Sequence, residues 1–155
     1  MIKLLGWEEI RHIWATELWV DRKSAIEPQS AMLFKTGHDM DNFNYLPRFF
    51  GYYLGSKLVG VNSGHGCSDG SYRSRGLWVN ENNRNTGIGT RLLRACIDQA
   101  LVEQRSYIWS YPRYTSWPVY KNAGFVLSSE WAVSETNNSN AFAKIDLKSI
   151  RNIDF

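Results

Sequence analysis

Two glycines, Gly87 and Gly89, separate a short apolar run from the most regular helical pattern of the chain. The run Leu77-Trp78-Val79 predicts the end of a strand over Ser71–Val79. After the glycines, one apolar stripe predicts a helix over Thr90–Gln104; its members are Leu92, Leu93, Cys96, Ala100 and Leu101. A strand, a glycine loop and a long helix in this order favour an α/β fold in which the helix packs on a sheet.

The predicted start of this helix offers a binding site for an anion. The first N–H groups of a helix lack intrahelical acceptors, and the helix dipole favours negative charge there. The two glycines let the backbone approach a ligand, Arg84 adds a positive charge, and the Thr90 hydroxyl can donate to a phosphate oxygen. The alternative is that the glycines only open a tight turn. A nucleoside-triphosphate loop is excluded because its Gly-Lys-Ser/Thr ending is missing, and Leu92 stands where the dinucleotide fingerprint needs a third glycine.

The rest of the chain predicts a mixed sheet with further helices. Further strands are predicted over Met1–Leu4, Arg48–Leu54, Leu58–Asn62, Tyr107–Tyr111, Phe125–Val133 and Ala141–Leu147. Helices are predicted over Trp7–Val20, over Ser30–Thr36, and in a short segment that Thr115 or Ser116 caps and Gly124 ends. A polar loop is predicted over Gly37–Asn44, and a glycine-rich loop over Gly64–Gly70. Antiparallel strands followed by one strand-helix-strand crossover predict a mixed α/β (α+β) fold, with residues 1–155 as one domain.

Composition narrows the class of protein. Hydrophobic residues make up 43% and charged residues 21% of the chain, which excludes a disordered protein. No apolar run approaches about 18 residues, and the start does not read as a signal peptide, so we expect no membrane span and a cytoplasmic location. Two cysteines and three scattered histidines argue against a zinc site, and we expect Cys67 and Cys96 to be reduced. A net charge of +3 suits a polyanionic small ligand as well as nucleic acid.

Two spaced motifs resemble those of the GNAT acyltransferase superfamily. Arg84-x-x-Gly87-x-Gly89, followed by the Leu-Leu helix, is similar to its motif A, and Tyr120-Lys121-Asn122-Ala123-Gly124-Phe125 is similar to its Tyr-x-x-x-Gly-Phe motif. The hairpin Tyr53–Gly60 is a weaker third match, and the resemblance covers about residues 48–147. It implies a mostly antiparallel sheet of six to seven strands, flanked by helices, whose central strands splay to hold coenzyme A (CoA).

The resemblance also implies where acetyl-CoA would bind. Pantetheine would lie between the splayed strands that contain Leu77 to Val79 and Tyr107 to Tyr111, and it would pair with the main chain of Trp78 and Val79. The pyrophosphate would sit on the N–H groups of Thr86, Gly87, Ile88, Gly89 and Thr90, beside Arg84 and Asn85. Arg113 stands about where many members carry a CoA-contacting Asn, so it would either reach a CoA phosphate or be solvated. No metal is implied.

By the same resemblance, Tyr120 is the general acid that protonates the leaving CoA thiolate. A tyrosine with a pKa of about 10 can donate to a thiolate whose conjugate acid has a pKa of about 8.5. The alternative is that Tyr120 only packs its helix on the sheet. The strand over Ser71–Val79 lacks the Glu that many members use as a base, so Glu81, His65 on the predicted Gly64–Gly70 loop, and a relay of water molecules remain as alternatives.

The resemblance places the acceptor near Ile26–Asn44 and the Gly64–Gly70 loop. Acidic residues there either attract a cationic amine or are simply solvated; they are Asp39, Asp41 and Asp69. Aromatic residues provide either a wall of the acceptor site or core; they are Trp14, Trp19, Phe43, Tyr45 and Trp117. The leading hypothesis is an acetyltransferase that moves an acetyl group from acetyl-CoA to a primary amine of a small molecule or peptide.

Two alternative functions remain open from the sequence. One is a non-catalytic CoA-binding sensor or docking module, although an intact Tyr120 argues against it. The other is an acyltransferase that acts on a nucleic-acid base, which basic residues such as Arg73 and Arg75 beside aromatics would allow. The small excess of positive charge argues against a nucleic-acid partner. A homodimer is compatible with such folds, but no feature of the sequence requires it.

Overall fold

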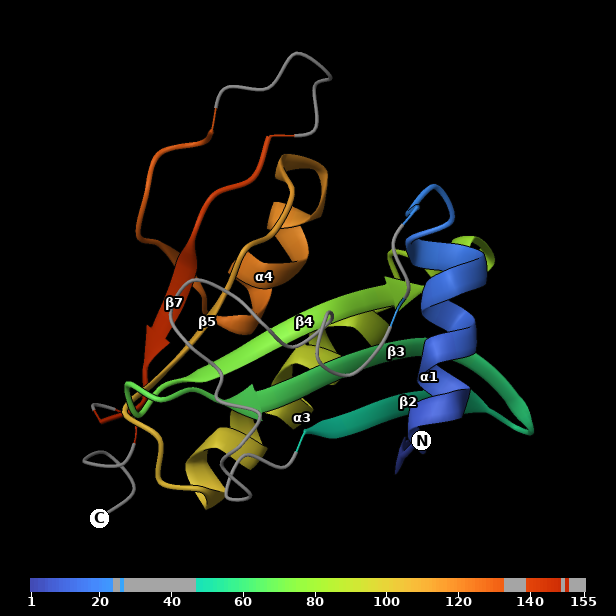
Figure 1. Ribbon diagram of the computed structural model, residues 1–155, viewed down its shortest axis with the longest axis horizontal. Helices are drawn as coiled ribbons and strands as arrows, with labels where there is room; N and C mark the ends of the chain where they lie inside the picture. Colours follow the sequence, from blue (N-terminus) through green and yellow to red (C-terminus); the bar gives the residue numbers. More distant parts are fainter. Residues whose placement is uncertain (24–25, 27–46, 133–138, 149, 151–155) are drawn as a thin grey trace.

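A computed structural model describes residues 1–23, 26, 47–132, 139–148 and 150. Its strands are β1 (Ile2–Leu4), β2 (Arg48–Leu54), β3 (Lys57–Gly66), β4 (Tyr72–Val79), β5 (Tyr107–Ser110), β6 (Val126–Leu127) and β7 (Ala143–Asp146). They form one seven-stranded sheet in the order β1-β2-β3-β4-β5-β7-β6, shown in Figure 1. Neighbouring strands are antiparallel except β4 and β5, which are parallel. The predicted mixed, mostly antiparallel fold is therefore confirmed, while the single domain over 1–155 stays a prediction.

Helices cover both faces of the sheet (Figure 1). One face carries α1 (Trp7–Ile13), which continues as the π-helical turn η1 (Trp14–Leu18). The other face carries α3 (Ile88–Val102) and α4 (Trp117–Ala123), while the 3-10 turns η2 (Glu81–Asn83) and η3 (Tyr114–Ser116) precede them. Each face has its own core: Trp14 and Trp78 belong to the α1 side, and Leu92 and Tyr120 belong to the α3 side.

Most of the predicted helices and strands are confirmed, although their first and last residues differ from the predicted ones. The long helix begins at Ile88, two residues earlier than predicted, and the N-terminal helix ends at Leu18. The prediction of a strand over Phe125–Val133 is wrong for most of its described length, because within residues 125–132 only Val126–Leu127 forms a strand, which pairs with β7. The predicted helix Ser30–Thr36 and the loop Gly37–Asn44 lie outside the described residues.

The predicted loop over Gly64–Gly70 is wrong at its start, because β3 runs on to Gly66. Gly64 pairs with Ser74 and Gly66 with Tyr72 across the β3–β4 ladder. A Cβ on Gly64 would run into the ring of Tyr72, and one on Gly66 would run into the guanidinium of Arg105. These glycines therefore make room for large neighbouring side chains within the sheet and do not interrupt it.

A β-bulge at Gly76 divides β4 into two parts. The register passes from Ser63↔Arg75 to Val61↔Trp78, so that β4 carries one more residue than β3 at this point. Gly76 has a φ of +80°, and its carbonyl accepts a hydrogen bond of 2.9 Å from the indole N–H of Trp14. A Cβ at this position would lie 2.5 Å from the Trp14 ring. Only glycine fits both the backbone conformation and the contact.

The bulge exchanges the faces of β4. Before it, the Ser74 hydroxyl lies on the α3 side, where it accepts a hydrogen bond from Asn62, while Arg75 lies over the Trp19 ring on the α1 side. After it, Leu77 packs against the α3 core and Trp78 joins the α1 core. One extra residue thus turns Leu77 and Trp78 to the faces opposite to those that regular alternation would give them.

β4 and β5 separate soon after they meet. Their ladder consists of Tyr72↔Ile108 and Arg73↔Trp109. One residue further on, the Ser110 hydroxyl donates to the Ser74 carbonyl at 2.8 Å, and the strands then diverge, as Figure 1 shows. The predicted splay of the central strands is therefore confirmed.

Candidate acyltransferase site

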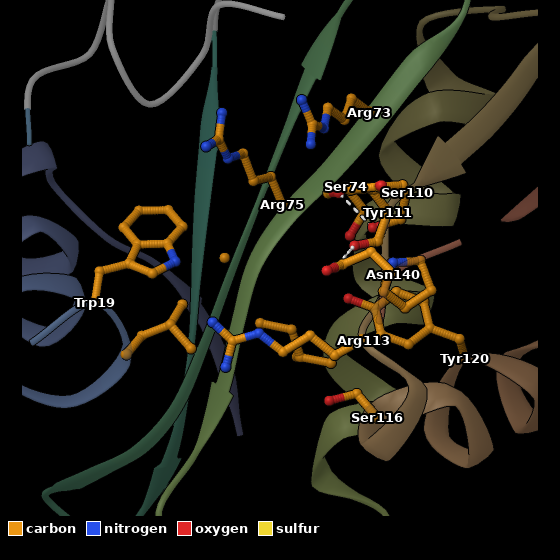
Figure 2. Close-up of a pocket in the computed structure, with 14 residues that line it drawn as sticks. Trp19, Arg73, Ser74, Arg75, Ser110, Tyr111, Arg113, Ser116, Tyr120 and Asn140 are labelled. Carbon is orange, nitrogen blue, oxygen red and sulfur yellow. Dashed lines mark hydrogen bonds between the residues drawn. The ribbon is translucent and has the colours of Figure 1, made fainter. Parts of the chain in front are cut away.

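A pocket of about 300 Å³ lies where β4 and β5 separate. Figure 2 shows Trp19 and Arg75 on one side of it and Tyr120, Ser110 and Tyr111 on the other. Arg113 extends across the opening between the two sides (Figure 2). The lining residues are Leu18, Trp19, Arg73, Ser74, Arg75, Gly76, Leu77, Ser110, Tyr111, Pro112, Arg113, Ser116, Tyr120 and Asn140. The structure thus brings together the predicted site residues Leu77, Arg113 and Tyr120.

Tyr120 reaches the pocket from the short helix α4. Pro118 stands in the first turn of α4, and Gly124 ends it with a φ of +106°, so the sequence fixes both ends of this helix. Tyr120 is 5% exposed, and its ring meets Phe125 edge to face at 5.4 Å between centroids. The motif therefore places one polar group, the Tyr120 hydroxyl, among apolar neighbours beside the strand opening.

Burial raises the pKa of Tyr120 to about 12. A hydrogen bond with the Ser110 side chain and the positive charge of Arg73 work in the opposite direction, and both lower this pKa. The phenol is therefore protonated throughout the neutral range, as a proton donor must be. Ser110 connects Tyr120 to β4, because its own hydroxyl bridges to Ser74.

Two arginines on β4, Arg73 and Arg75, line the α1 side of the pocket, and the sequence analysis did not place them there. Arg73 is 9% exposed and lies over the Trp109 ring at 4.6 Å, and half-buried Arg75 lies over the Trp19 ring at 5.3 Å. Burial, followed by repulsion from Arg75, lowers the pKa of Arg73 to about 9. Among the described residues that line the pocket, none is acidic. Positive charge is therefore concentrated at this opening.

The glycine loop before α3 lies at the far end of β4. Asn85 and Gly87 have φ values of 62° and 86°, and a Cβ on Gly87 would meet nothing within 4 Å. Arg84 folds back so that its Nε donates to the Val79 carbonyl at 2.9 Å, and the Thr86 hydroxyl donates to the carbonyl of Asn83. The loop therefore leads directly into the first turn of α3 with its outer surface open.

A glycine at position 89 is required by the packing of α3 against α4. It is buried in the first turn of α3, and a Cβ there would lie 2.9 Å from the Val119 side chain of α4. Thr90 follows it and is half-buried. The missing side chain at Gly89 thus allows α3 and α4 to approach each other, whereas the open position is that of Gly87.

The two predicted bases, His65 and Glu81, do not line the pocket. His65 is fully buried in β3 opposite Arg73, not on a loop, and its Nδ1 lies 3.2 Å from the Gly66 carbonyl oxygen. Glu81 is exposed in η2, beyond the end of β4. His65 was expected on a loop because the loop was predicted to begin at Gly64, whereas β3 continues to Gly66.

Asp69 is engaged in a structural turn. Its Oδ1 accepts hydrogen bonds from the N–H and hydroxyl of Ser71, and its Oδ2 accepts one of 2.7 Å from the Tyr107 hydroxyl. Burial alone would raise the pKa of Asp69, but these hydrogen bonds outweigh it and lower the pKa. Asp39 and Asp41 lie outside the described residues, as do Phe43 and Tyr45.

Within the described ranges, no three His, Cys, Asp or Glu side chains gather closely enough to hold a metal ion. Across the same part of the chain, no helix has the length and apolar character needed to cross a membrane. Cys67 and Cys96 are both buried and free.

Comparison with known proteins decides the family. The model of the acetyltransferase (GNAT) domain family matches residues 46–127, which is more than half of the chain. This chain belongs to the GNAT acetyltransferase family. The matched residues of this GNAT chain include β2 to β5, the glycine loop, α3 and Tyr120.

Solved structures agree with this GNAT fold. An aminoglycoside 6'-N-acetyltransferase complexed with coenzyme A is 11% identical, with a TM-score of 0.68 over 95% of this chain and 97% of its own. A GNAT-family acetyltransferase from Staphylococcus aureus Mu50 is 14% identical, with a TM-score of 0.63 over 95% and 99%. A GNAT-family acetyltransferase from Elizabethkingia anophelis with acetyl-CoA bound is 14% identical, with a TM-score of 0.55 over 64% and 76%. No curated protein sequence matches the chain.

Proposed function

We propose that this protein transfers an acetyl group from acetyl-CoA directly to a primary amine of a small molecule or peptide, with Tyr120 as the general acid. The observation that carries the proposal is the position of Tyr120, whose buried phenol lines the pocket at the point where β4 and β5 separate. Membership of the GNAT family supports acyl-CoA as the donor.

The residues around the pocket fit CoA. From Leu77 to Val79, β4 lies beyond the two residues that pair with β5, so this strand edge can pair with the pantetheine amides. The N–H groups of Thr86, Gly87, Ile88, Gly89 and Thr90 belong to the loop and first turn of α3, where a pyrophosphate is favoured. The open position at Gly87 admits a phosphate close to the backbone. Asn85 shapes the loop through its own positive φ.

Two arginines complete this proposed CoA site. Arg84 uses its Nε to fix the end of β4, which leaves its terminal nitrogens for the pyrophosphate. Arg113 crosses the opening of the pocket (Figure 2), and in this proposal its guanidinium contacts a CoA phosphate. When bound, acetyl-CoA supplies the activated acyl thioester.

Tyr120 has the protonation state that the proposed transfer needs. The amine nitrogen forms a bond to the acetyl carbonyl carbon, the carbon–sulfur bond breaks, and the thiolate takes the proton of the Tyr120 hydroxyl. A raised pKa of about 12 keeps this proton in place until the thiolate forms. The phenol is therefore still in its acid form when the thiolate leaves.

The amine proton leaves through water in this proposal. His65 and Glu81, the two bases that the sequence suggested, do not line the pocket. An aqueous path is available because the pocket is open and lined by polar groups such as Ser116 and Asn140. The water relay regenerates the Tyr120 hydroxyl after the thiol has left.

Calorimetric titration with acetyl-CoA, followed by an assay of CoA release, tests the proposal. We expect micromolar binding, and release of free thiol with at least one primary amine in a broad panel. Binding without release for any amine would favour a CoA-binding module over an enzyme. An absence of binding by folded protein would show that the glycine loop is only a turn, and the proposal would be withdrawn.

A further inference from the structure

The arginines on β4 form one wall of the pocket that contains Tyr120. Arg73 and Arg75 both lie before the Gly76 bulge and point toward the α1 side, while Tyr120 lines the opposite side (Figure 2). The pocket volume is about 300 Å³, enough for a small molecule to span the two walls. An acceptor bound here would have one end beside Tyr120 and the other beside the two guanidinium groups.

The position of Arg73 and Arg75 along β4 separates them from the proposed phosphate sites of CoA. The glycine loop follows Val79, and a strand rises about 3.3 Å per residue. Arg75 and Arg73 therefore lie roughly 13 to 20 Å before the end of the strand. A pyrophosphate on the loop is out of reach of both side chains, so their charge serves the acyl and acceptor end of the pocket.

The guanidinium groups of Arg73 and Arg75 each lie over an aromatic ring. Arg73 lies over Trp109, and Arg75 lies over Trp19, whose ring also carries Arg22 at 5.5 Å. A stacked guanidinium loses little further freedom when it binds a carboxylate or phosphate through two parallel hydrogen bonds. The wall is thus preorganised for an oxygen anion.

The clustering of positive charge also favours an anion. Burial comes first among the causes that lower the pKa of Arg73 and of Arg75, and repulsion follows: from Arg75 on Arg73, and from Arg22 on Arg75. An anion between the arginines would relieve this repulsion, whereas a polycationic acceptor would increase it. None of the described lining residues is an acid that could receive a second ammonium group.

We propose that the acceptor amine also carries an anionic oxygen group, a carboxylate or a phosphate, which Arg73 and Arg75 bind. This inference rests on the proposed acetyltransferase function. Asp69, one of the three acids that suggested a cationic acceptor in the sequence, is hydrogen-bonded to Ser71 and Tyr107 and does not line the pocket, while Asp39 and Asp41 lie outside the described residues. Free amino acids and phosphorylated amines are the two sources of such chemistry.

The test compares acceptors that differ only in the anion. CoA release is measured with free amino acids against their primary amides, and with O-phosphoethanolamine against ethanolamine. We expect kcat/KM for the anionic member of at least one pair to exceed that of its neutral partner by about 100-fold. Arg75→Gln should abolish most of this preference through KM, Arg75→Lys should retain part of it, and both should bind acetyl-CoA as the wild type does. Arg94→Gln, on the exposed side of α3, is the matched control and should change neither quantity.

Each outcome separates the two proposals. A preference for carboxylates or for phosphates that Arg75→Gln removes supports the inference and identifies the source of the anion. Equal or better turnover of the neutral amines, or of polyamines, overturns the inference and leaves the acetyltransferase proposal intact. If none of the amines tested causes release of CoA, the acetyltransferase proposal is overturned and the inference with it.

Discussion

At the scale of single residues, Tyr120 is the side chain whose replacement is most informative. In Tyr120→Phe only the hydroxyl is lost, so the packing on Phe125 is kept. Loss of a general acid lowers kcat by about 10²- to 10³-fold, while the Kd for acetyl-CoA stays unchanged. The folded state should lose only about 1 kcal/mol, because one hydrogen bond with Ser110 disappears.

Steady-state kinetics and calorimetry on the same preparation check this prediction. Tyr114→Phe is the control, since Tyr114 is 61% exposed and is not among the residues that line the pocket. Unchanged kcat in Tyr120→Phe would remove this hydroxyl from the mechanism and leave Tyr120 as a packing residue.

The sequence predicted some residues of the site and missed others for a physical reason. Tyr120 was recognisable because a fixed motif ends its helix at Gly124, and Arg113 follows from its place after β5. Arg73 and Arg75 were visible only as basic residues. Their position in the pocket depends on where β4 and β5 separate, and the alternation of residues along β4 alone cannot reveal where its pairing with a distant strand ends.

At the scale of elements, the loop before α3 can be tested by one pair of glycine variants. Gly87 and Gly55 both have positive φ values, 86° and 60°, and a Cβ at either would meet nothing within 4 Å. Alanine should therefore cost about the same stability at each, about 1–2 kcal/mol. Only Gly87→Ala should weaken acetyl-CoA binding, by about 10-fold or more, because only this loop would touch the pyrophosphate.

Denaturant unfolding and calorimetry of Gly87→Ala and Gly55→Ala give the two quantities. Equal stability losses with equal acetyl-CoA affinities would contradict a phosphate site at this loop. The Gly55 variant thus controls for backbone strain, which the loop variant shares.

The bulge of β4 gives a second prediction at this scale. Gly76→Ala adds a Cβ 2.5 Å from the ring of fully buried Trp14, at a φ of +80°. Strain and overpacking together should lower the free energy of unfolding by about 2–5 kcal/mol, more than in Gly55→Ala. Urea unfolding measures both variants side by side. A loss no larger than that of Gly55→Ala would mean that Trp14 yields easily and does not hold the bulge.

Helices and strands were predictable where one local sequence pattern determined them. The apolar stripe of α3 and the hairpin of β2 and β3 are local patterns, and the structure confirms both. The extension of β3 to Gly66 depends on Tyr72 and Arg105, two residues that fill the space above Gly64 and Gly66 from elsewhere in the chain. Glycine in a sequence indicates a turn more readily than it indicates a bulky neighbour, so the end of β3 was misplaced.

At the scale of the whole molecule, buried ionisable groups link stability to high pH. Burial raises the pKa of Cys96 and of Tyr120 to about 12 each, and it raises the pKa of Tyr72 as well. All three belong to the core between the sheet and α3. In the unfolded chain these groups ionise near their ordinary values, about 8.5 for cysteine and about 10 for tyrosine. Between those values and the folded ones, the folded state binds more protons than the unfolded state.

The sign of the effect follows from this difference in bound protons. The stabilisation is fully present below the unfolded pKa values and is lost as the pH rises through the folded ones, so the free energy of unfolding should fall from about pH 9 to pH 12. Each group contributes up to about 1.4 kcal/mol per pH unit in its window. Urea unfolding at pH 8.5, pH 10 and pH 11 measures the slope in the wild type and in Tyr120→Phe. Between pH 10 and pH 11 the slope should be smaller in the variant by up to one group's share, while Tyr114→Phe keeps the wild-type slope. Equal slopes in all three proteins would mean that the Tyr120 phenol ionises at its ordinary pKa, and that burial does not hold its proton.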